Sequence, residues 1–223
     1  MKEADMEKRL INTIPKNNRK EGVILIGRGP SVDTLHTIKL SEQKKYDTCT
    51  ISDAIKLVQS PTYAFCYHYQ AINRMATFLK NPKYLIMPTN IQERLKKRSW
   101  YHLINAIEEL HNDYYFHGRN RKDMKIFSSG KFDINVTDKL FNRYGSVVGA
   151  VHFLVGYMGY KTIYYIGFDG GAQYGKLVHS NRKETKIKGA VRDYAESWRT
   201  IPELLKHYPI NTFEPLKEFL KKP

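Results

Sequence analysis

Short runs of consecutive apolar residues alternate along the chain with longer segments of helical spacing. The first run, Val23–Ile26, lies between two glycines and is typical of a strand buried on both faces. Further strands are expected at 46–52, 62–69, 84–87, 162–166 and 212–213, and helices at 32–38, 147–158, 187–206 and 215–222. This alternation predicts an α/β, Rossmann-like fold with a mostly parallel central sheet and helices on both faces.

The pattern favours one domain with an insertion. Residues 1–20 are polar and predict an N-terminal arm or helix, whereas 21–223 predict a single Rossmann-like nucleotide-binding domain. The stretch 92–143 differs, because it is basic and aromatic and has few clean strands. We expect an insertion there, a lid or an acceptor-facing region, with a helix over 104–110 and a short strand over 125–127. The alternative is a set of ordinary loops and helices packed on the sheet.

The composition indicates a folded protein without a membrane span. Of 223 residues, 41% are hydrophobic, and no apolar run approaches the roughly 20 residues of a spanning helix. The charged start of the chain lacks an apolar signal core, so we expect a cytoplasmic protein. Cys49 and Cys66 lie in strand-like apolar contexts, which predicts buried thiols rather than a disulfide framework.

A formal net charge of +15 favours a polyanionic partner. Nucleic acid, an anionic membrane surface contacted peripherally, and lipopolysaccharide all fit this charge. The alternative is a generally basic, soluble surface with no particular ligand. The basic residues cluster at 94–98, 119–125 and 182–188. Those we assign to acceptor or polyanion binding are Arg94, Lys97, Arg98, Arg119, Arg121 and Lys122.

The apolar run 23–26 leads into a glycine-rich loop that could bind a nucleotide. Ligands of open α/β sheets bind beyond the carboxyl ends of the strands, where glycines let the backbone approach a phosphate or ribose. The spacing is not the G-x-G-x-x-G of dinucleotide-binding proteins, and only Asp53 is near the place of an NAD-binding carboxylate. A structural turn is the alternative. The candidate nucleotide-binding residues of this loop are Gly27, Arg28, Gly29, Pro30 and Ser31.

Three later segments also contain candidate binding or catalytic residues. Gly145 and Ser146 open a helix and offer amides and a hydroxyl to a phosphate, although Ser146 could simply cap that helix. Asp169 follows a strand and could hold a ribose or amino group, a metal, or its own loop backbone. His179 lies in a polar loop and has the side-chain type of a general base at neutral pH, although an exposed loop histidine is usually not catalytic.

The motifs at 26–31 (Ile-Gly-Arg-Gly-Pro-Ser), 145–147 (Gly-Ser-Val) and 159–169 (Gly-Tyr-Lys-Thr-Ile-Tyr-Tyr-Ile-Gly-Phe-Asp) occur in an order that resembles a known group. They are similar to the bacterial sialyltransferases that use CMP-sialic acid. They also resemble the related domain family of 6-hydroxymethylpterin pyrophosphokinase-like proteins. The resemblance covers about half of the chain, 22–70 and 143–206, and implies a single-domain variant of the GT-A glycosyltransferase fold.

The resemblance also implies roles for single residues. Arg28 replaces an asparagine that helps the sialyltransferases to bind their donor, and its guanidinium could instead pair with a phosphate. His179 would match the family's proposed base, which deprotonates the acceptor hydroxyl. The positions implied to contact phosphate, ribose or base are Gly27, Gly29, Ser31, Ser52, Gly145, Ser146 and Tyr174.

These inferences lead to three candidate functions. The first is a nucleotide-sugar-dependent glycosyltransferase, using a CMP-sugar or another nucleotide sugar, with His179 as base and no metal. Its acceptor would be anionic, such as a hydroxylated base in phage DNA or a lipooligosaccharide. The second is a Mg²⁺-dependent pyrophosphokinase-like enzyme that uses ATP, with Asp169 as a metal ligand. The third is a non-catalytic nucleic-acid-binding module on a degenerate Rossmann core.

Overall fold

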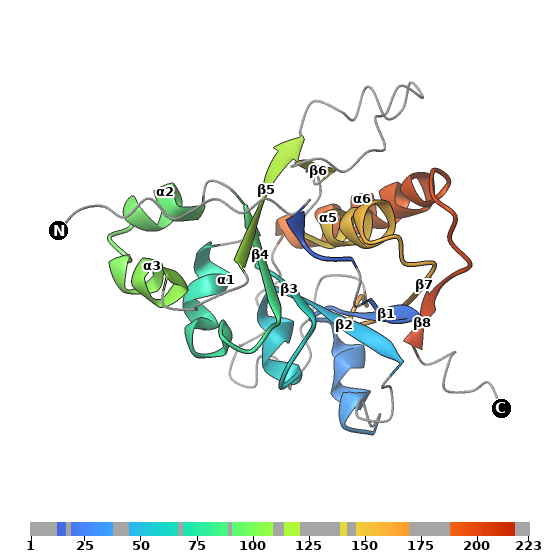
Figure 1. Cartoon of the computed structure of the whole chain (residues 1–223), viewed down its shortest axis with the longest axis horizontal. Helices are drawn as coiled ribbons and strands as arrows, with labels where there is room; N and C mark the ends of the chain where they lie inside the picture. The colour runs from blue at the N-terminus through green and yellow to red at the C-terminus, as the bar shows by residue number, and fades with distance from the viewer. Residues whose placement is uncertain are drawn as a thin grey trace.

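The chain forms an α/β, Rossmann-like fold around one parallel sheet (Figure 1). The computed structural model describes residues 13–16, 19–37, 45–66, 69–88, 91–108, 114–120, 139–141, 146–169 and 188–216. In this part of the chain eight strands pair in the order β6-β5-β4-β3-β2-β1-β7-β8, and every neighbouring pair is parallel. The predicted fold class is confirmed.

The elements have the following bounds. The strands are β1 Gly22–Ile26, β2 Tyr46–Ile51, β3 Tyr63–Phe65, β4 Tyr84–Pro88, β5 Tyr114–Asn120, β6 Lys139–Phe141, β7 Thr162–Ile166 and β8 Thr212–Pro215. The α-helices are α1 Tyr69–Arg74, α2 Ile91–Lys96, α3 Tyr101–Glu108, α5 Ser146–His152 and α6 Lys188–Leu205. Three 3₁₀ segments, η2 Pro30–Thr37, η4 Ser52–Leu57 and η5 Ala76–Phe78, and a π-helical turn, η6 Phe153–Tyr157, complete the set.

Both faces of the sheet are covered, as the continuous apolar run of β1 predicts. All five residues of β1 are buried. Val23 and Leu25 point to one face and pack in a core shared with α5, η6 and α6. Ile24 and Ile26 point to the other face and pack with η2 and η4. On that second face, α1, α2 and α3 enclose a further apolar cluster against β3 and β4.

The structure differs from the expected elements in several places. The helix expected at 32–38 is the 3₁₀ segment η2, and the helix expected at 147–158 divides into α5 and the π-helical η6. This second helix stops before Gly159, whose φ of +71° suits a helix C-terminus. Within 92–143, α2, α3, β5 and β6 belong to the layers of the main sheet, and the sequence did not predict the two strands.

Several expectations fall outside the described residues. These are most of the N-terminal arm, the strand at 125–127 and the terminal helix beyond 216. The prediction of buried thiols is confirmed for Cys49 and Cys66, and burial raises the pKa of both. In the described segments, no helix combines the length and apolar character needed to cross a bilayer.

Candidate active site at the carboxyl edge

The order of the strands brings the two predicted nucleotide loops together. The strand β1 pairs with β2 on one side and with β7 on the other, so the loops after β1 and β7 are neighbours. Open parallel sheets bind ligands in the crevice at this kind of position, beyond the carboxyl ends of the strands. We call this side of the sheet the carboxyl edge, and the segments 27–31 and 167–169 the loop pair.

Backbone and side-chain hydrogen bonds join the loop pair. The N–H of Gly29 donates to the carbonyl of Gly167 at 2.7 Å, and the N–H of Ser31 donates to the Asp169 carboxylate at 2.7 Å. In return, the N–H of Gly167 donates to Oγ of Ser31 at 2.8 Å. Ser31 and Asp169 therefore bind the facing loop, 138 residues away in sequence, and their contact with a ligand stays a prediction.

The two glycines of the first loop are required by this packing. A Cβ at Gly29 would lie 2.5 Å from Oδ2 of Asp169 and 2.9 Å from the carbonyl oxygen of Gly167. A Cβ at Gly27 would collide with the same carbonyl oxygen. Real Cβ atoms do not approach this closely, so close contact between the loops is sufficient to explain both glycines, whether or not a phosphate also binds there.

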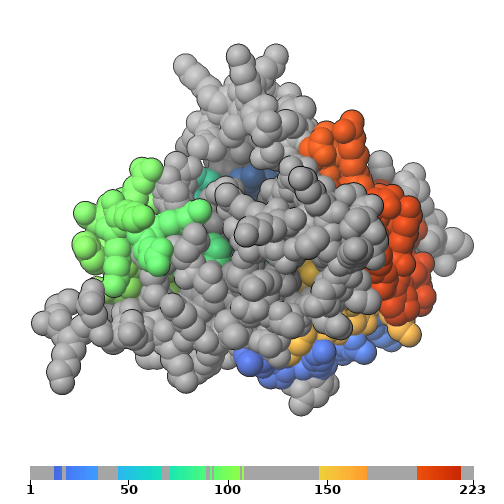
Figure 2. All heavy atoms as spheres, turned by 90° about the horizontal axis from the view of Figure 1, so that it is seen from above, coloured from blue at the N-terminus to red at the C-terminus, as the bar shows by residue number. Residues whose placement is uncertain are grey.

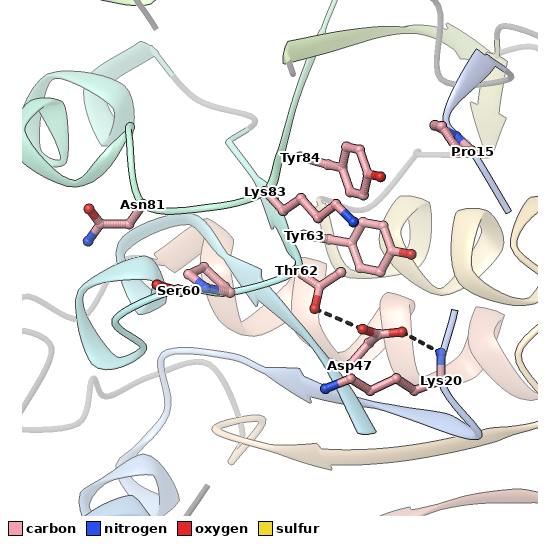
Figure 3. Close-up of a pocket in the computed structure, with 10 residues that line it drawn as sticks. Pro15, Lys20, Asp47, Ser60, Thr62, Tyr63, Asn81, Lys83 and Tyr84 are labelled. Atoms are coloured by element: carbon pink, nitrogen blue, oxygen red, sulfur yellow. Dashed lines mark hydrogen bonds between the residues drawn. The ribbon is translucent and has the colours of Figure 1, made fainter. Parts of the chain in front are cut away.

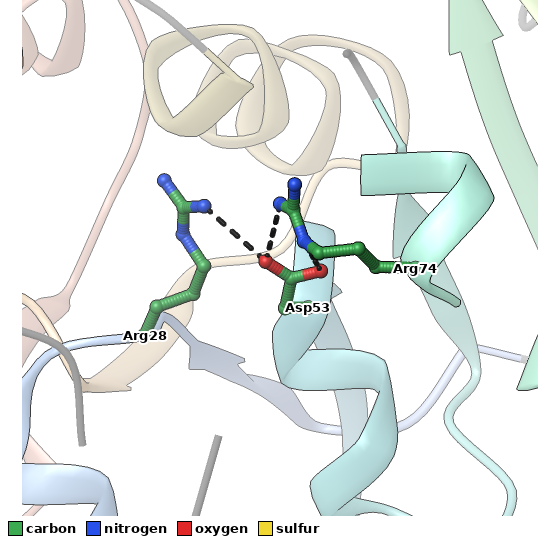
Figure 4. Close-up of polar contacts among 3 residues, drawn as sticks. All are labelled: Arg28, Asp53 and Arg74. Carbon is green, nitrogen blue, oxygen red and sulfur yellow. Dashed lines mark hydrogen bonds and ion pairs between the residues drawn. The ribbon is translucent and has the colours of Figure 1, made fainter. Parts of the chain in front are cut away.

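Two arginines converge on one buried carboxylate beside the loop pair (Figure 4). Arg74 donates to both oxygens of Asp53, from Nε at 3.2 Å and from Nη2 at 2.7 Å. Nη1 of Arg28 lies 3.6 Å from Oδ2 of the same carboxylate. The Asp53 side chain is fully buried, whereas both arginine side chains are 30% exposed.

These three residues come from three consecutive strand ends. Arg28 follows β1, Asp53 lies in η4 after β2, and Arg74 ends the helix after β3. The two guanidinium groups and the carboxylate have a formal charge of +1 between them, and each arginine side chain is 30% exposed. A planar guanidinium held by a bidentate bond is preorganised to bind phosphate or carboxylate oxygens. The sequence predicted Arg28 but missed Arg74, because no local motif marks it among 37 lysines and arginines.

Ser52, which was predicted to contact the ribose, has an unusual backbone conformation. Its φ is +52°, in the left-handed region that non-glycine residues rarely adopt, and only 2% of the residue is exposed. Such backbone strain concentrates at functional sites. Ser52 directly precedes Asp53, so this turn carries the chain from β2 to the carboxylate that holds the two arginines.

A cavity of about 410 Å³ opens on the β7 side of the loop pair. Its polar lining includes Ser31, Thr34 and Asp169, and its aromatic lining includes Tyr165, Phe168 and Trp198. The ring of Trp198 lies 5.0 Å from that of Tyr165, centroid to centroid. An apolar wall with a few polar groups is typical of small-molecule sites. The sequence contained no signal for Trp198 beyond its place on an expected helix.

The fold of this chain is similar to that of a solved glycosyltransferase structure. The structure of MAf glycosyltransferase from Magnetospirillum magneticum AMB-1 matches 89% of this chain with a TM-score of 0.53 and 14% sequence identity. The match covers 32% of that protein, so this chain spans about a third of its length. No family model matches the chain, and no curated protein matches it. At this identity, the similarity supports the fold alone, and the sialyltransferase-like and pyrophosphokinase-like resemblances stay expectations.

Some of the remaining predicted site residues lie in the described segments, and the others lie outside them. Ser146 begins α5 and is 9% exposed. Arg94, Lys97 and Arg98 lie on or just after α2, and Arg119 lies on β5, where the backbone alone is described. Figure 2 shows the α2–α3 region, in green, and the end of α6, in orange and red, on opposite sides of the molecule. The residues outside the described segments are Gly145, Tyr174, His179, Arg121 and Lys122.

The described segments contain no group of three or more His, Cys, Asp or Glu side chains that could hold a metal ion. Asp169, the metal ligand of the second candidate function, accepts the Ser31 N–H.

Proposed function

We propose that this chain is a glycosyltransferase that uses a nucleotide-sugar donor and transfers the sugar to a hydroxyl of an anionic acceptor. The observation behind this proposal is the cluster of Arg28, Asp53 and Arg74, in which two arginine side chains, each 30% exposed, lie beside the loop pair. A glycosyltransferase of similar fold gives further support. The donor phosphate would bind at this cluster, close to the ends of β1, β2 and β3.

The reaction would be a single displacement. The acceptor oxygen attacks the anomeric carbon, the bond between that carbon and the phosphate oxygen breaks, and the nucleotide leaves with the electron pair. His179 takes the proton of the acceptor hydroxyl. Arg28 and Arg74 stabilise the negative charge that grows on the leaving phosphate, which is electrostatic stabilisation by groups already fixed in place.

The first test is nucleotide binding by the whole chain. CMP, UDP, GDP, ADP and ATP are compared in a thermal-shift assay, followed by calorimetric titration of any nucleotide that raises the melting temperature. A nucleotide at 100 times its Kd stabilises the folded state by about 2.7 kcal/mol, which is easily detected. If no nucleotide raises the melting temperature, the proposal is wrong.

A matched pair of variants then tests the cluster. Arg74→Gln removes a guanidinium bound to buried Asp53, and we expect nucleotide binding about tenfold weaker or worse, because charge-assisted bonds to phosphate are lost. The control, Arg199→Gln, removes an arginine that is paired with Glu196 and is 78% exposed. We expect this control to keep the wild-type Kd. Equal Kd values for the two variants would contradict the role of the cluster.

Turnover separates the transferase from its rivals. With the donor identified, His179→Ala should lower kcat about 100-fold or more while binding of the donor is retained, as expected for loss of a general base. Activity that survives EDTA favours the transferase. Loss of activity on chelation, together with diphosphate transfer from ATP, would favour the pyrophosphokinase-like alternative.

A further inference from the structure

The opposite edge of the sheet carries a row of lysines. Lys45, Lys83 and Lys161 directly precede β2, β4 and β7, and Lys20 lies two residues before β1. Because all the strands are parallel, these four residues lie at the same side of the sheet, which we call the amino edge. In the order β4-β3-β2-β1-β7 the row spans four strand spacings, about 19 Å.

The side chains of this row are open to solvent. All four lysines are exposed, and none forms an ion pair with a carboxylate of the described residues. Nζ of Lys20 donates to the carbonyl of Tyr46 at 3.2 Å. Among the described residues, Glu21 is the one exposed acidic residue within the row. In the described part of this edge, four ammonium groups face one exposed carboxylate, so the charge there is positive.

The nearest buried carboxylate does not neutralise the row. Asp47 is 3% exposed and accepts three hydrogen bonds, from the backbone N–H of Lys20 at 2.9 Å, from Thr62 Oγ1 at 3.0 Å and from the Tyr160 hydroxyl at 2.5 Å. These donors satisfy the carboxylate within the protein. The ammonium groups above it remain available to an outside anion.

A cavity of about 390 Å³ lies within this edge. Figure 3 shows Lys20 and Lys83 on opposite sides of Thr62 and Asp47, around this cavity. The Ser60 hydroxyl and the Asn81 amide add hydrogen-bonding groups to its lining. The volume lies within the range of about 300–1,000 Å³ that is typical of small-ligand sites, so one nucleotide unit is a fitting occupant.

We propose that the amino edge binds single-stranded nucleic acid, with successive phosphates on the lysine row and one nucleotide in the cavity. A row of cations suits a linear phosphodiester better than a flat membrane. A membrane-binding face also needs an apolar anchor, and in the described segments the one large exposed apolar side chain is Tyr101, on α3. This inference does not depend on the proposed function, which uses the other edge.

A charge-matched pair of variants tests the location of this site. Binding of a fluorescein-labelled oligo(dT) is followed by anisotropy at several salt concentrations. Lys45→Glu/Lys83→Glu and the control Arg94→Glu/Lys97→Glu each lower the net charge by four, from +15 to +11. We expect the amino-edge variant to bind about tenfold more weakly or worse, with its salt slope reduced by about 1.4 for two lost phosphate contacts. The control should stay within about twofold of the wild type.

Three results would overturn the proposal. Equal losses in the two variants would mean that total charge decides binding. A larger loss in the control would place the site at Arg94 and Lys97, as the sequence predicted. Binding of the wild type to phosphatidylglycerol vesicles but not to oligo(dT) would identify a membrane ligand instead.

The same site can be tested in the wild-type protein by measuring which lysines the bound oligonucleotide protects from chemical modification. Brief lysine acetylation, read by mass spectrometry, should show oligo(dT) protecting Lys45, Lys83 and Lys161 but not Lys97. Equal protection of Lys97 would contradict the proposal. The affinity for mononucleotides is measured on the same samples. A failure of the glycosyltransferase proposal can then be told apart from a failure of this one.

Discussion

The two edges of the sheet use positive charge in different ways. At the carboxyl edge, Arg28 and Arg74 are held by the fully buried carboxylate of Asp53, beside loops joined by short hydrogen bonds. At the amino edge, Lys45, Lys83 and their neighbours are exposed and unpaired with carboxylates of the described residues. The first arrangement fixes the position and direction of each charge, whereas the second leaves long, flexible lysine stems exposed along the strand ends.

This difference shows why total charge is a poor guide to function. Fixed guanidinium groups favour one ligand of defined shape, since little freedom is lost when that ligand binds. Ammonium groups on flexible stems favour a polymer, because its repeated phosphates can pair with them in many alignments. The net charge of +15 is compatible with both. Only the burial of Asp53 and the exposure of the lysine row separate the two kinds of site.

The largest effect is expected for Asp53→Asn. This change removes the buried negative charge between two guanidinium groups, which are left facing one another. Breaking a buried pair in this way is strongly destabilising, and because the arginines are 30% exposed we expect the free energy of unfolding to fall by about 3 kcal/mol. Urea denaturation of the purified variant measures this change.

The control for Asp53→Asn is an exposed ion pair. Glu203→Gln removes a carboxylate that lies 2.8 Å from Nζ of Lys206, with both side chains more than half exposed. We expect a loss below about 1 kcal/mol, because surface pairs are screened by solvent. Similar losses in the two variants would show that Asp53 is not a buried anchor of the arginines.

A second prediction compares glycines at the two edges. Gly29→Ala places a Cβ against Asp169 at the carboxyl edge, and Gly22→Ala places one 2.8 Å from the carbonyl oxygen of Thr162 at the amino edge. Both changes overpack the structure, so each should lower the free energy of unfolding by about 2 kcal/mol. Only Gly29→Ala should also weaken nucleotide binding, measured by calorimetry on the folded fraction. Wild-type nucleotide affinity in Gly29→Ala would separate the loop pair from the donor site.

Sequence patterns predict the parts of this fold that depend on neighbours along the chain. The strands at 23–26 and 162–166 are continuous apolar runs, and the structure has them within one residue. The strands β5 and β6 were missed because Tyr114–Asn120 mixes aromatic, basic and polar residues, and Lys139–Phe141 is very short. Their identity as strands follows from pairing at the end of the sheet, which no local pattern records.

In the candidate site, too, the contacts between residues distant in the sequence could not be predicted. The loop after β1 could be predicted, since glycines after a buried strand are a local signal. The bond of Asp53 to Arg74 spans 21 residues, and that of Ser31 to Asp169 spans 138. Because the strand order determines such partners, the sequence could identify neither Arg74 nor the bond between Ser31 and Asp169.

The smallest expected effect concerns the polar layer beneath the lysine row. Tyr160→Phe removes the hydroxyl that donates to buried Asp47 and lies 3.1 Å from the hydroxyl of Tyr63. The carboxylate keeps its bonds from Lys20 and Thr62, so we expect a loss of about 1.5 kcal/mol at neutral pH. Urea denaturation measures it. Tyr101→Phe, which removes an exposed hydroxyl, is the control and should cost less than about 0.5 kcal/mol.

The same variant has a distinct behaviour in alkali. Burial raises the pKa of Tyr160 and of Tyr63 above the usual value, so the folded state keeps phenol protons that the unfolded chain loses above about pH 10. Stability is therefore retained below that pH and falls as the pH rises beyond it. Tyr160→Phe loses one such proton, and its decline should be shallower by up to about 1.4 kcal/mol per pH unit. Parallel declines in the two proteins would contradict the raised pKa of Tyr160, because the hydroxyl would then lose its proton at the same pH in the folded and unfolded states.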